Sequence, residues 1–529
     1  MTMASLILIP IIFGVILYKI PLKIGKVFLM LIQLFLSVNA ANLFLRSRSG
    51  EVVHEILGGT DPILYIGLRG DRIALVFVCL TIILFTMAFI YSIRDKFFDK
   101  KFLLLFLILE GVLIGVFLTD DIFNLFVLLE VSTVVITILI MFKKDKRSIY
   151  DGLFYLIIQI ISMMFFLFGI AYLYKIFGVL SIGEITDLIA RGVPRETLIL
   201  PFAFLMTGVC LKIGFFPLFS WVPRSYGTPS TPIVVVAILS GLFVKSSLYL
   251  FTRLNHIFYP ALDYREFFLV IAVLSGVIGF IKALSQKNIK LLLAYSTISQ
   301  VGLIAVSSLI SSEMAYWGGI YHILNHAILK TMLFLATGMV IDQYNTANVN
   351  EIRGLLKKMP LVSVAILFGF LGITGAPLFN GSISKYWILG GADTLAIESV
   401  IWIINTGTLL TYIKYASILF GDSEVKPKTD PLKAGVVLFL SIACLLGGIF
   451  GRQIVYFLYD IDLYIGVSSY LNKGLIYFVQ LVIGIIFYKY VISKSKALDK
   501  LGEGSLTLPQ SCFILLMFFT SLIAYGIMF

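Results

Sequence analysis

The stretch FLMTGVCLKIGFFPLFSWVP at positions 204–223 decides the fold of this chain. Its length is close to the ~20 residues that an α-helix needs to cross a bilayer. Lys212 places a charge near its middle, and Pro217 cannot donate the backbone hydrogen bond that a continuous helix requires there. We therefore expect a membrane-spanning helix that is broken beside a buried lysine, as at many ion and substrate sites.

The whole chain has the composition of a membrane protein. Of its 529 residues, 60% are hydrophobic and 13% are charged, and the mean hydropathy is +1.02. A soluble protein is ~45–50% apolar and ~25% charged. This composition excludes a soluble enzyme, a nucleic-acid-binding protein and a disordered scaffold. We therefore attribute the net charge of +12 to cationic loops on the cytoplasmic side of the membrane, and not to binding of nucleic acid.

Sixteen apolar stretches are long enough to cross the membrane. They lie at about 3–20, 26–45, 73–93, 102–118, 122–142, 150–177, 197–221, 232–258, 266–284, 291–312, 314–342, 361–389, 399–420, 432–450, 474–493 and 506–528. They should be helices, because a bilayer offers no water to unpaired backbone groups. The fold class is therefore an all-α polytopic membrane protein.

The loops between these stretches differ in charge. Lysine and arginine gather in the loops after odd-numbered stretches, for example at 143–147 and 353–358. Loops after even-numbered stretches contain acids such as Asp120 and Asp121. By the positive-inside rule the cationic loops are cytoplasmic. We therefore expect a multi-pass protein of the cytoplasmic membrane with both termini outside.

The sequence contains no pattern typical of a bound cofactor or metal. The four cysteines lie far apart within apolar stretches and lack the spacing of metal or iron–sulfur ligands. A phosphate-binding loop and a dinucleotide fingerprint are also absent from the sequence. We expect neither a cofactor nor a catalytic site in this chain.

We single out seven ionisable residues within the expected spans, where a charged side chain costs at least ~2.5–3.5 kcal/mol on insertion scales. Glu130 and Lys212 lie well inside their stretches, so they form either a functional pair or a structural ion pair. Lys245 and Lys385 could alternatively extend to the membrane interface if they lie near a span end.

His322, His326 and Lys330 follow one another at a spacing of four residues and so share one helical face. An imidazole accepts a proton on one nitrogen and donates from the other, so such a face is suited to proton transfer. Two alternatives stay open. The histidines could be core residues bonded to backbone carbonyls, or ligands of a haem or metal, although no third ligand is nearby in the sequence.

Two expected helix breaks have the same local sequence. Pro-Leu-Phe occurs at 217–219 and again at 377–379, where Asn380-Gly381 follows Pro377. The first break lies in a block formed by the fourth to eighth spans, and the second lies in a block formed by the ninth to thirteenth. Because each block has five spans, an odd number, the second block begins on the opposite side of the membrane. This parity predicts an inverted repeat, which is common in transporters.

Several stretches resemble the antiporter-like subunits shared by Mrp-type cation/proton antiporters, respiratory complex I and membrane-bound hydrogenases. The matching stretches are DIFNLFVLLE around Glu130, LKIGFFPLFSWVPRSYGTPSTP around Lys212, ILSGLFVK ending at Lys245, IKLLLAYSTISQVGL, YHILNHAILKTMLF and NGSISKYW around Lys385. Together they cover about residues 70–420, and the chain most resembles the D-type Mrp subunit and its hydrogenase counterpart. Relatives usually have histidines where this chain has Ser220 and Ser225-Tyr226. No stretch typical of the lateral helix of the longer complex I subunit is evident.

The resemblance implies a fourteen-span core of two inverted five-helix repeats with broken seventh and twelfth spans, plus about two extra C-terminal spans. The corresponding parts are N-terminal spans at 1–101, a first half-channel at 102–260, a second at 261–425 and C-terminal spans at 426–529.

The resemblance also implies a proton-conducting axis at mid-membrane. Glu130 and Lys212 would form the charged pair of the first half-channel, and Lys245 would be the bridge. His322, His326 and Lys330 would be the link, and Lys385 would be the terminal group of the second half-channel.

The predicted function is a subunit of a multi-subunit membrane complex that moves protons or exchanges them for Na+. Expected partners are other antiporter-like and small membrane subunits. Peripheral iron–sulfur subunits would belong to a redox-driven pump or hydrogenase, and the sequence does not decide between such a pump and a stand-alone antiporter. The alternative is a single-chain secondary transporter of an organic solute, which would need a substrate pocket.

Overall fold

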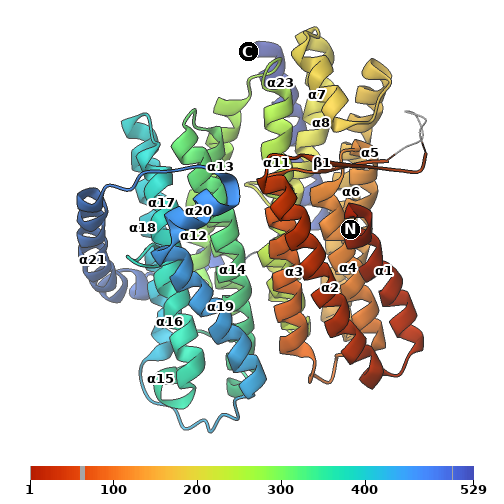
Figure 1. Ribbon diagram of the computed structural model, residues 1–529. Coiled ribbons are helices and arrows are strands. Elements are labelled where there is room, and N and C mark those ends of the chain that lie inside the picture. The colour runs from red at the N-terminus through yellow and green to blue at the C-terminus, as the bar shows by residue number, and fades with distance from the viewer. Residues whose placement is uncertain (1, 60–65, 503, 505) are drawn as a thin grey trace.

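The computed structural model describes residues 2–59, 66–502, 504 and 506–529. In this part of the chain, one bundle of helices carries a single two-stranded hairpin (Figure 1). All sixteen expected stretches are helical, and fourteen of the described helices are long and apolar enough to cross a membrane.

The N-terminal region consists of three helices and the hairpin. These elements are α1 (Met3–Lys19), α2 (Leu22–Arg48), β1 (Val53–Leu57), β2 (Ile66–Gly70) and α3 (Arg72–Ser92). The antiparallel strands place Val53 opposite Gly70, and the N–H of Asp120 donates to the carbonyl of Gly67. The end of the bundle that carries the hairpin and residues 119–121 is called the hairpin face below.

Both termini lie toward the hairpin face. The backbone N–H of Met3 donates to Oε2 of Glu55 at 2.5 Å in β1. At the other end of the chain, Arg195 donates to the carbonyl of Gly526 at 3.1 Å. These two bonds tie both ends of the chain to elements at the hairpin face.

The first block of helices begins at α4. Its elements are α4 (Lys100–Leu118), α5 (Ile122–Ile140), α6 (Lys146–Phe177), α7 (Ile182–Ala190), α8 (Arg195–Ile213), α9 (Val222–Gly227), α10 (Ile233–Ile238), a π-helix (Leu239–Phe243) and α11 (Val244–Phe258). Helix α8 is the broken seventh span. It ends at Ile213, four residues before Pro217, because Gly214 adopts a left-handed conformation with φ of +78° that a glycine allows without strain.

The second block follows the same plan. Its elements are α12 (Arg265–Ser285), α13 (Ile289–Leu309), α14 (Glu313–Tyr344), α15 (Leu355–Lys358), α16 (Pro360–Thr374), α17 (Asn380–Gly390), α18 (Leu395–Ala416) and a 3₁₀-helix (Ser417–Leu419). The twelfth span is divided into α16 and α17, and Gly375 ends α16 with φ of +86°. At both breaks a glycine therefore ends the helix before the proline that the sequence indicated.

The C-terminal region surrounds the second block. It contains α19 (Pro431–Ile449), α20 (Gly451–Tyr459), α21 (Val467–Tyr490), a 3₁₀-helix (Ile492–Lys494), α22 (Lys496–Gly502) and α23 (Leu508–Met528). Helix α19 completes a core of fourteen spans, and α23 packs against α8 of the first block.

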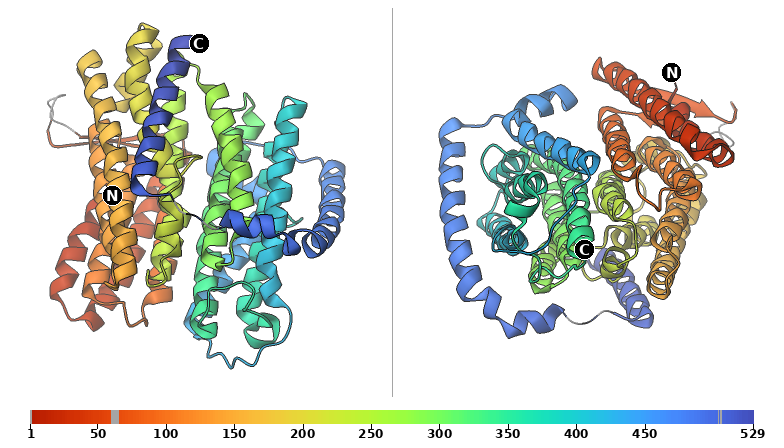
Figure 2. Two further views of the ribbon diagram at one scale, coloured as in Figure 1. Left: turned by 180° about the vertical axis from the view of Figure 1, so that it is seen from behind. Right: turned by 90° about the horizontal axis from the view of Figure 1, so that it is seen from below.

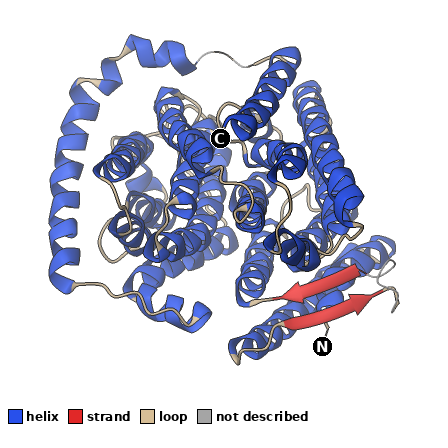
Figure 3. Ribbon diagram, turned by 90° about the horizontal axis from the view of Figure 1, so that it is seen from above, coloured by secondary structure: helices blue, strands red, loops and turns tan. Residues whose placement is uncertain are grey.

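Helix α21 differs from the sequence-based expectation for 474–493. It is long and apolar enough to cross a membrane, but it runs across the side of the bundle instead of along it (Figures 2 and 3). Only Tyr477 and Gly484 of α21 are buried. It is a lateral helix, so the expectations of a spanning helix at 474–493 and of no lateral helix are both corrected. The reason is that a lateral helix and a spanning helix can share the same length and hydropathy.

Candidate functional site

The buried ionisable residues singled out from the sequence lie on neighbouring helices of the two blocks. Lys212, Lys245, His322, His326, Lys330 and Lys385 have relative exposures between 0% and 6%, and Glu130 is half-buried. Lys245 and Lys385 are therefore buried and do not extend to the surface of this chain.

Glu130 and Lys212, which the sequence analysis grouped as a charged pair, are not in direct contact. Nζ of Lys212 on α8 donates instead to Oγ1 of Thr133 on α5 at 2.8 Å. Among the described residues, Oε2 of Glu130 is buried without a hydrogen-bond partner. The two charges still interact, but through space and not through contact. A single turn of α5 thus carries both the carboxylate and the hydroxyl that face Lys212.

Two polar residues of α6, spaced by four, had no clear signal in the sequence. The hydroxyl of Tyr155 and the amide of Gln159 are buried without hydrogen-bond partners among the described residues. The ring of Tyr155 packs edge-on against Trp221 at 5.5 Å, which is just after the α8 break. Unpaired buried polar atoms are costly, so this region can accept water or a transferred proton.

Lys245 follows directly after the π-helix. Its ammonium donates to the carbonyl of Ser240, five residues earlier, within that irregular turn. The hydroxyl of Ser240 in turn lies 3.0 Å from Oγ1 of Thr297 on α13. Lys245 is thus connected through Ser240 to the second block. π-helical turns are often found at functional sites.

The ammonium of Lys330 on α14 donates hydrogen bonds to three oxygens. Its Nζ donates to Oγ of Ser296 at 2.6 Å, to the carbonyl of Leu293 at 2.8 Å and to the hydroxyl of Tyr412 at 3.0 Å. Ser296 and Tyr412 lie on α13 and α18. All three acceptors are neutral, so the ammonium is oriented without a carboxylate.

His322 connects α14 to the second break. One ring nitrogen lies 2.8 Å from Oγ of Ser384 on α17, and the other lies 3.0 Å from Oε1 of Gln300 on α13. The amide of Gln300 continues the chain to Oγ1 of Thr408 at 2.8 Å. Because Ser384 precedes Lys385, these bonds lead from α13 to the lysine of the second break.

His326 behaves differently from His322. Its two ring nitrogens are buried and have no hydrogen-bond partner in the described part of the chain. Its ring is nearly parallel to that of His322, with centroids 6.0 Å apart. The interpretation of both histidines as core residues bonded to backbone carbonyls is therefore wrong. Within the described residues there is also no group of three or more possible metal ligands.

Lys385 is held by the helix break itself. Its Nζ donates to the carbonyl of Ile373 at 2.8 Å. In a continuous helix this carbonyl would accept from residue 377, but Pro377 has no N–H. The break therefore supplies a backbone acceptor for the lysine at the depth of the bundle core.

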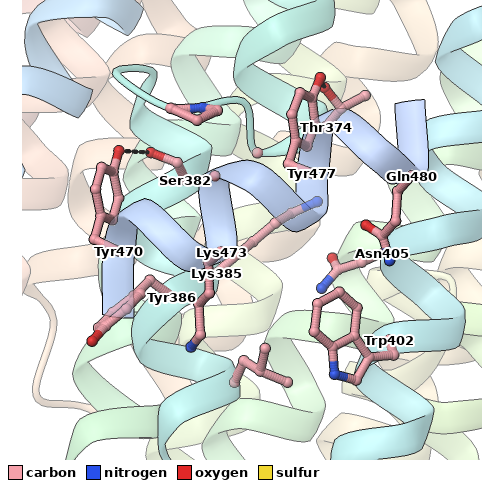
Figure 4. A pocket seen from close by; sticks show the side chains of 14 residues that line it. Thr374, Ser382, Lys385, Tyr386, Trp402, Asn405, Tyr470, Lys473, Tyr477 and Gln480 are labelled. Carbon is pink, nitrogen blue, oxygen red and sulfur yellow. Dashed lines mark hydrogen bonds between the residues drawn. The ribbon is translucent and has the colours of Figure 1, made fainter. Parts of the chain in front are cut away.

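The lateral helix α21 contacts both sides of this break (Figure 4). The hydroxyl of Tyr477 lies 2.8 Å from Oγ1 of Thr374, at the end of α16. The hydroxyl of Tyr470 lies 2.8 Å from Oγ of Ser382, on α17. Together with Lys473 these tyrosines line a cavity of about 80 Å³ at Lys385, which has room for a few water molecules.

The fold and these contacts define a class: a polytopic membrane protein in which buried lysines and histidines connect two broken helices. The chain belongs to the NADH:quinone oxidoreductase/Mrp antiporter transmembrane family, whose model matches residues 119–413.

Sequence relatives come from both branches of this family. The chain is 30% identical over 326 residues to the N-type subunit of the NADH-quinone oxidoreductase of Desulforudis audaxviator, which is 60% of this chain and 64% of that protein. It is 30% identical over 368 residues to the D-type subunit of the Na(+)/H(+) antiporter of Alkalihalophilus pseudofirmus, which is 68% of this chain and 73% of that protein. The match therefore spans less than two thirds of the oxidoreductase relative.

Solved structures show the same fold. A chain of the membrane-bound sulfane sulfur reductase, an archaeal respiratory membrane complex, has a TM-score of 0.80 and 25% identity, and the match covers 91% of this chain and 99% of that one. A chain of the Mrp complex from Dietzia sp. also has a TM-score of 0.80, with 20% identity, covering 91% of this chain and all of that one. The second likeness concerns the fold alone.

Proposed function

We propose that this chain is a proton-translocating subunit of a multi-subunit membrane complex. The observation that carries the proposal is the surroundings of its buried cations. Lys212, Lys245, Lys330 and Lys385 all donate to neutral oxygens, and no carboxylate lies within ion-pair distance of any of them among the described residues. A buried lysine without a fixed counter-ion can take and release a proton, whereas a tightly paired one stays charged.

The proposed route has two halves. In the first, the proton passes from the Glu130–Lys212 region to Lys245, through the hydroxyls near the π-helix. In the second, it passes along Lys330, His326 and His322 to Lys385 and the cavity beside it. The proposed division is an N-terminal part at 1–101, half-channels at 102–260 and 261–425 with helix breaks at Pro217 and Pro377, and a C-terminal part at 426–529.

The proposal includes sodium because a sequence relative is named as a sodium/proton antiporter subunit. The A. pseudofirmus relative is named as part of a Na(+)/H(+) antiporter, so exchange of protons for Na+ is the proposed form of the activity. The described residues that line the cavity at Lys385 include no carboxylate, so we assign no Na+ site to this cavity.

The proposed setting is the cytoplasmic membrane, with the hairpin face and both termini outside. The proposed partners are other antiporter-like and small membrane subunits, because the similar solved structures are multi-subunit membrane complexes. Peripheral iron–sulfur subunits are proposed only for the case in which the complex is a redox-driven pump.

The test is proton flux in vesicles that contain the purified native complex, driven by an imposed pH gradient and followed with a pH-sensitive dye. Lys330→Met should abolish the flux, because it removes the ammonium group that would carry the proton and that donates to Ser296 and Tyr412. Lys357→Met makes the same chemical change at an exposed lysine paired with Asp422 and should leave the flux intact. Equal flux in both variants would overturn the proposal. Uptake of an organic solute without proton flux would favour the single-chain transporter instead.

A further inference from the structure

A large cavity opens at the hairpin face, away from the Lys385 break. Its volume is about 770 Å³. It lies between β2, α3, α7, α11 and α14, so it borders both blocks. Its polar lining includes Arg69, Asp71, Asp187, Tyr249, Arg253 and His256.

One face of α11 forms a polar stripe that leads inward from this cavity. His256, Arg253, Thr252 and Tyr249 line the cavity, and Lys245 lies four residues before Tyr249. Residues at this spacing lie on one helical face, and four residues advance a helix by ~6 Å. The cavity thus ends one turn from the central lysine of the proposed route.

Tyr249 forms the inner end of the cavity. Its ring packs against Phe77 and Phe117, with both centroid distances at 5.5 Å. Its side chain is only 7% exposed. Its hydroxyl makes no hydrogen bond to a described residue, although a phenol can both donate and accept. Tyr249 therefore combines an aromatic ring packed into the bundle core with a hydroxyl free to exchange a proton.

Two of the other charged groups around the cavity, Arg253 and Asp71, are held at its wall. Arg253 bonds the carboxylate of Asp120 at 3.1 Å and also the carbonyl of Thr119 at 3.3 Å. Asp71 caps α3 by accepting from the N–H of Ala74 at 2.9 Å. Nε of Arg69 is buried and has no partner among the described residues. This lining contains both signs of charge, which suits water and protons more than a single class of charged solute.

We infer that this cavity is a third access route, through which Lys245 exchanges protons with the hairpin side without using the second half-channel, and that Tyr249 is the gate residue of this route. The inference rests on the proposed function. It adds a point of proton entry or exit between the two halves, at the residue that connects them.

Thiol labelling tests whether the route is open. In a variant whose four native cysteines are replaced by alanine, Thr252→Cys should react with a membrane-impermeant, positively charged thiol reagent. The reaction should occur only from the side that also labels Thr197→Cys, at an exposed residue near the start of α8. Ser246→Cys, buried on the same helix, should stay unlabelled from both sides. Absence of Thr252→Cys labelling in the intact complex would show that the cavity is covered, and it would overturn the route.

Proton flux tests whether the route is used. Labelled Thr252→Cys should lose flux, whereas labelled Thr197→Cys should not. Tyr249→Phe keeps the ring and removes the hydroxyl, so it should lower flux about tenfold or more, as loss of a proton-transfer group does. The control Tyr259→Phe, at an exposed residue after α11, should be unaffected.

The outcomes separate this inference from the proposed function. Full flux in both Tyr249→Phe and labelled Thr252→Cys, together with lost flux in Lys330→Met, would overturn only the third route. Unchanged flux in Lys330→Met would overturn the proposed function itself, whatever the labelling shows.

Discussion

The ammonium of Lys385 donates to the carbonyl of Ile373 at 2.8 Å, and that carbonyl has no helical partner because α16 ends at Thr374 and Pro377 has no N–H. The proline therefore supplies an acceptor as well as a bend. A lysine held by one neutral oxygen beside a small cavity can lose and regain its proton with little rearrangement.

Pro377→Ala should disturb this arrangement. Alanine restores an N–H that competes with Lys385 for the carbonyl of Ile373, so we expect flux to fall severalfold with normal protein levels. Pro360→Ala is the matched control, because Pro360 lies at the start of α16 where no N–H is needed. Parental flux in Pro377→Ala would show that the acceptor is not important.

The lateral helix should be necessary for the geometry at Lys385. Tyr470→Phe and Tyr477→Phe each remove one hydroxyl that bonds a side of the break. We expect each to cost about 1 kcal/mol of local stability, and the double variant to lower proton flux more than either alone. Tyr490→Phe, at an exposed position of the same helix, is the control. Flux in the double variant equal to that in Tyr490→Phe would show that α21 only covers the bundle.

Glu130 and Lys212 should act as a unit although they do not touch. We expect Glu130→Gln to abolish flux while the complex still assembles. A double-mutant cycle with Lys212→Ala should be strongly non-additive, as is usual for groups in one site. Thr133→Val should also lower flux, because it removes the hydroxyl that Lys212 contacts at 2.8 Å. Additive effects in the cycle would make Glu130 and Lys212 independent residues.

Topology can be checked by labelling. Lys144→Cys, in the exposed turn between α5 and α6, should react with an impermeant thiol reagent only after the cytoplasmic side is made accessible. Thr197→Cys should react in intact cells. The opposite pattern would invert the orientation and place the hairpin face inside.

Much of the fold follows from the sequence because hydropathy specifies membrane helices directly. Each of the sixteen apolar stretches is a helix, and both broken spans were indicated by Pro217 and Pro377. The direction of α21 could not be predicted in this way. Its apolar length is compatible with either orientation, and its contacts with Thr374 and Ser382 decide that it lies across the bundle.

The site was predicted less completely than the fold. Buried charges stand out in an apolar sequence, so the seven ionisable residues that were singled out are buried or half-buried. Glu110, Asp151 and Lys290 are buried as well and were missed. The hydrogen-bond partners were also missed, because Gln300, Ser384 and Tyr412 are uncharged and resemble many other polar residues in the chain. The hydrogen bond from Lys212 to Thr133 was missed too, because a hydroxyl one turn from Glu130 has no distinctive signal in the sequence.

The central claim is that buried lysines change charge while protons cross the membrane. Lys385→Arg tests it most directly, because arginine keeps the positive charge but cannot release a proton at any accessible pH. Proton flux should be measured in vesicles containing the intact complex, with Lys357→Arg at an exposed lysine as the control. We predict that Lys385→Arg blocks flux as completely as Lys385→Ala, with protein levels unchanged and with normal flux in the control. Flux near the parental rate in Lys385→Arg would contradict the account, because Lys385 would then serve only as a fixed positive charge.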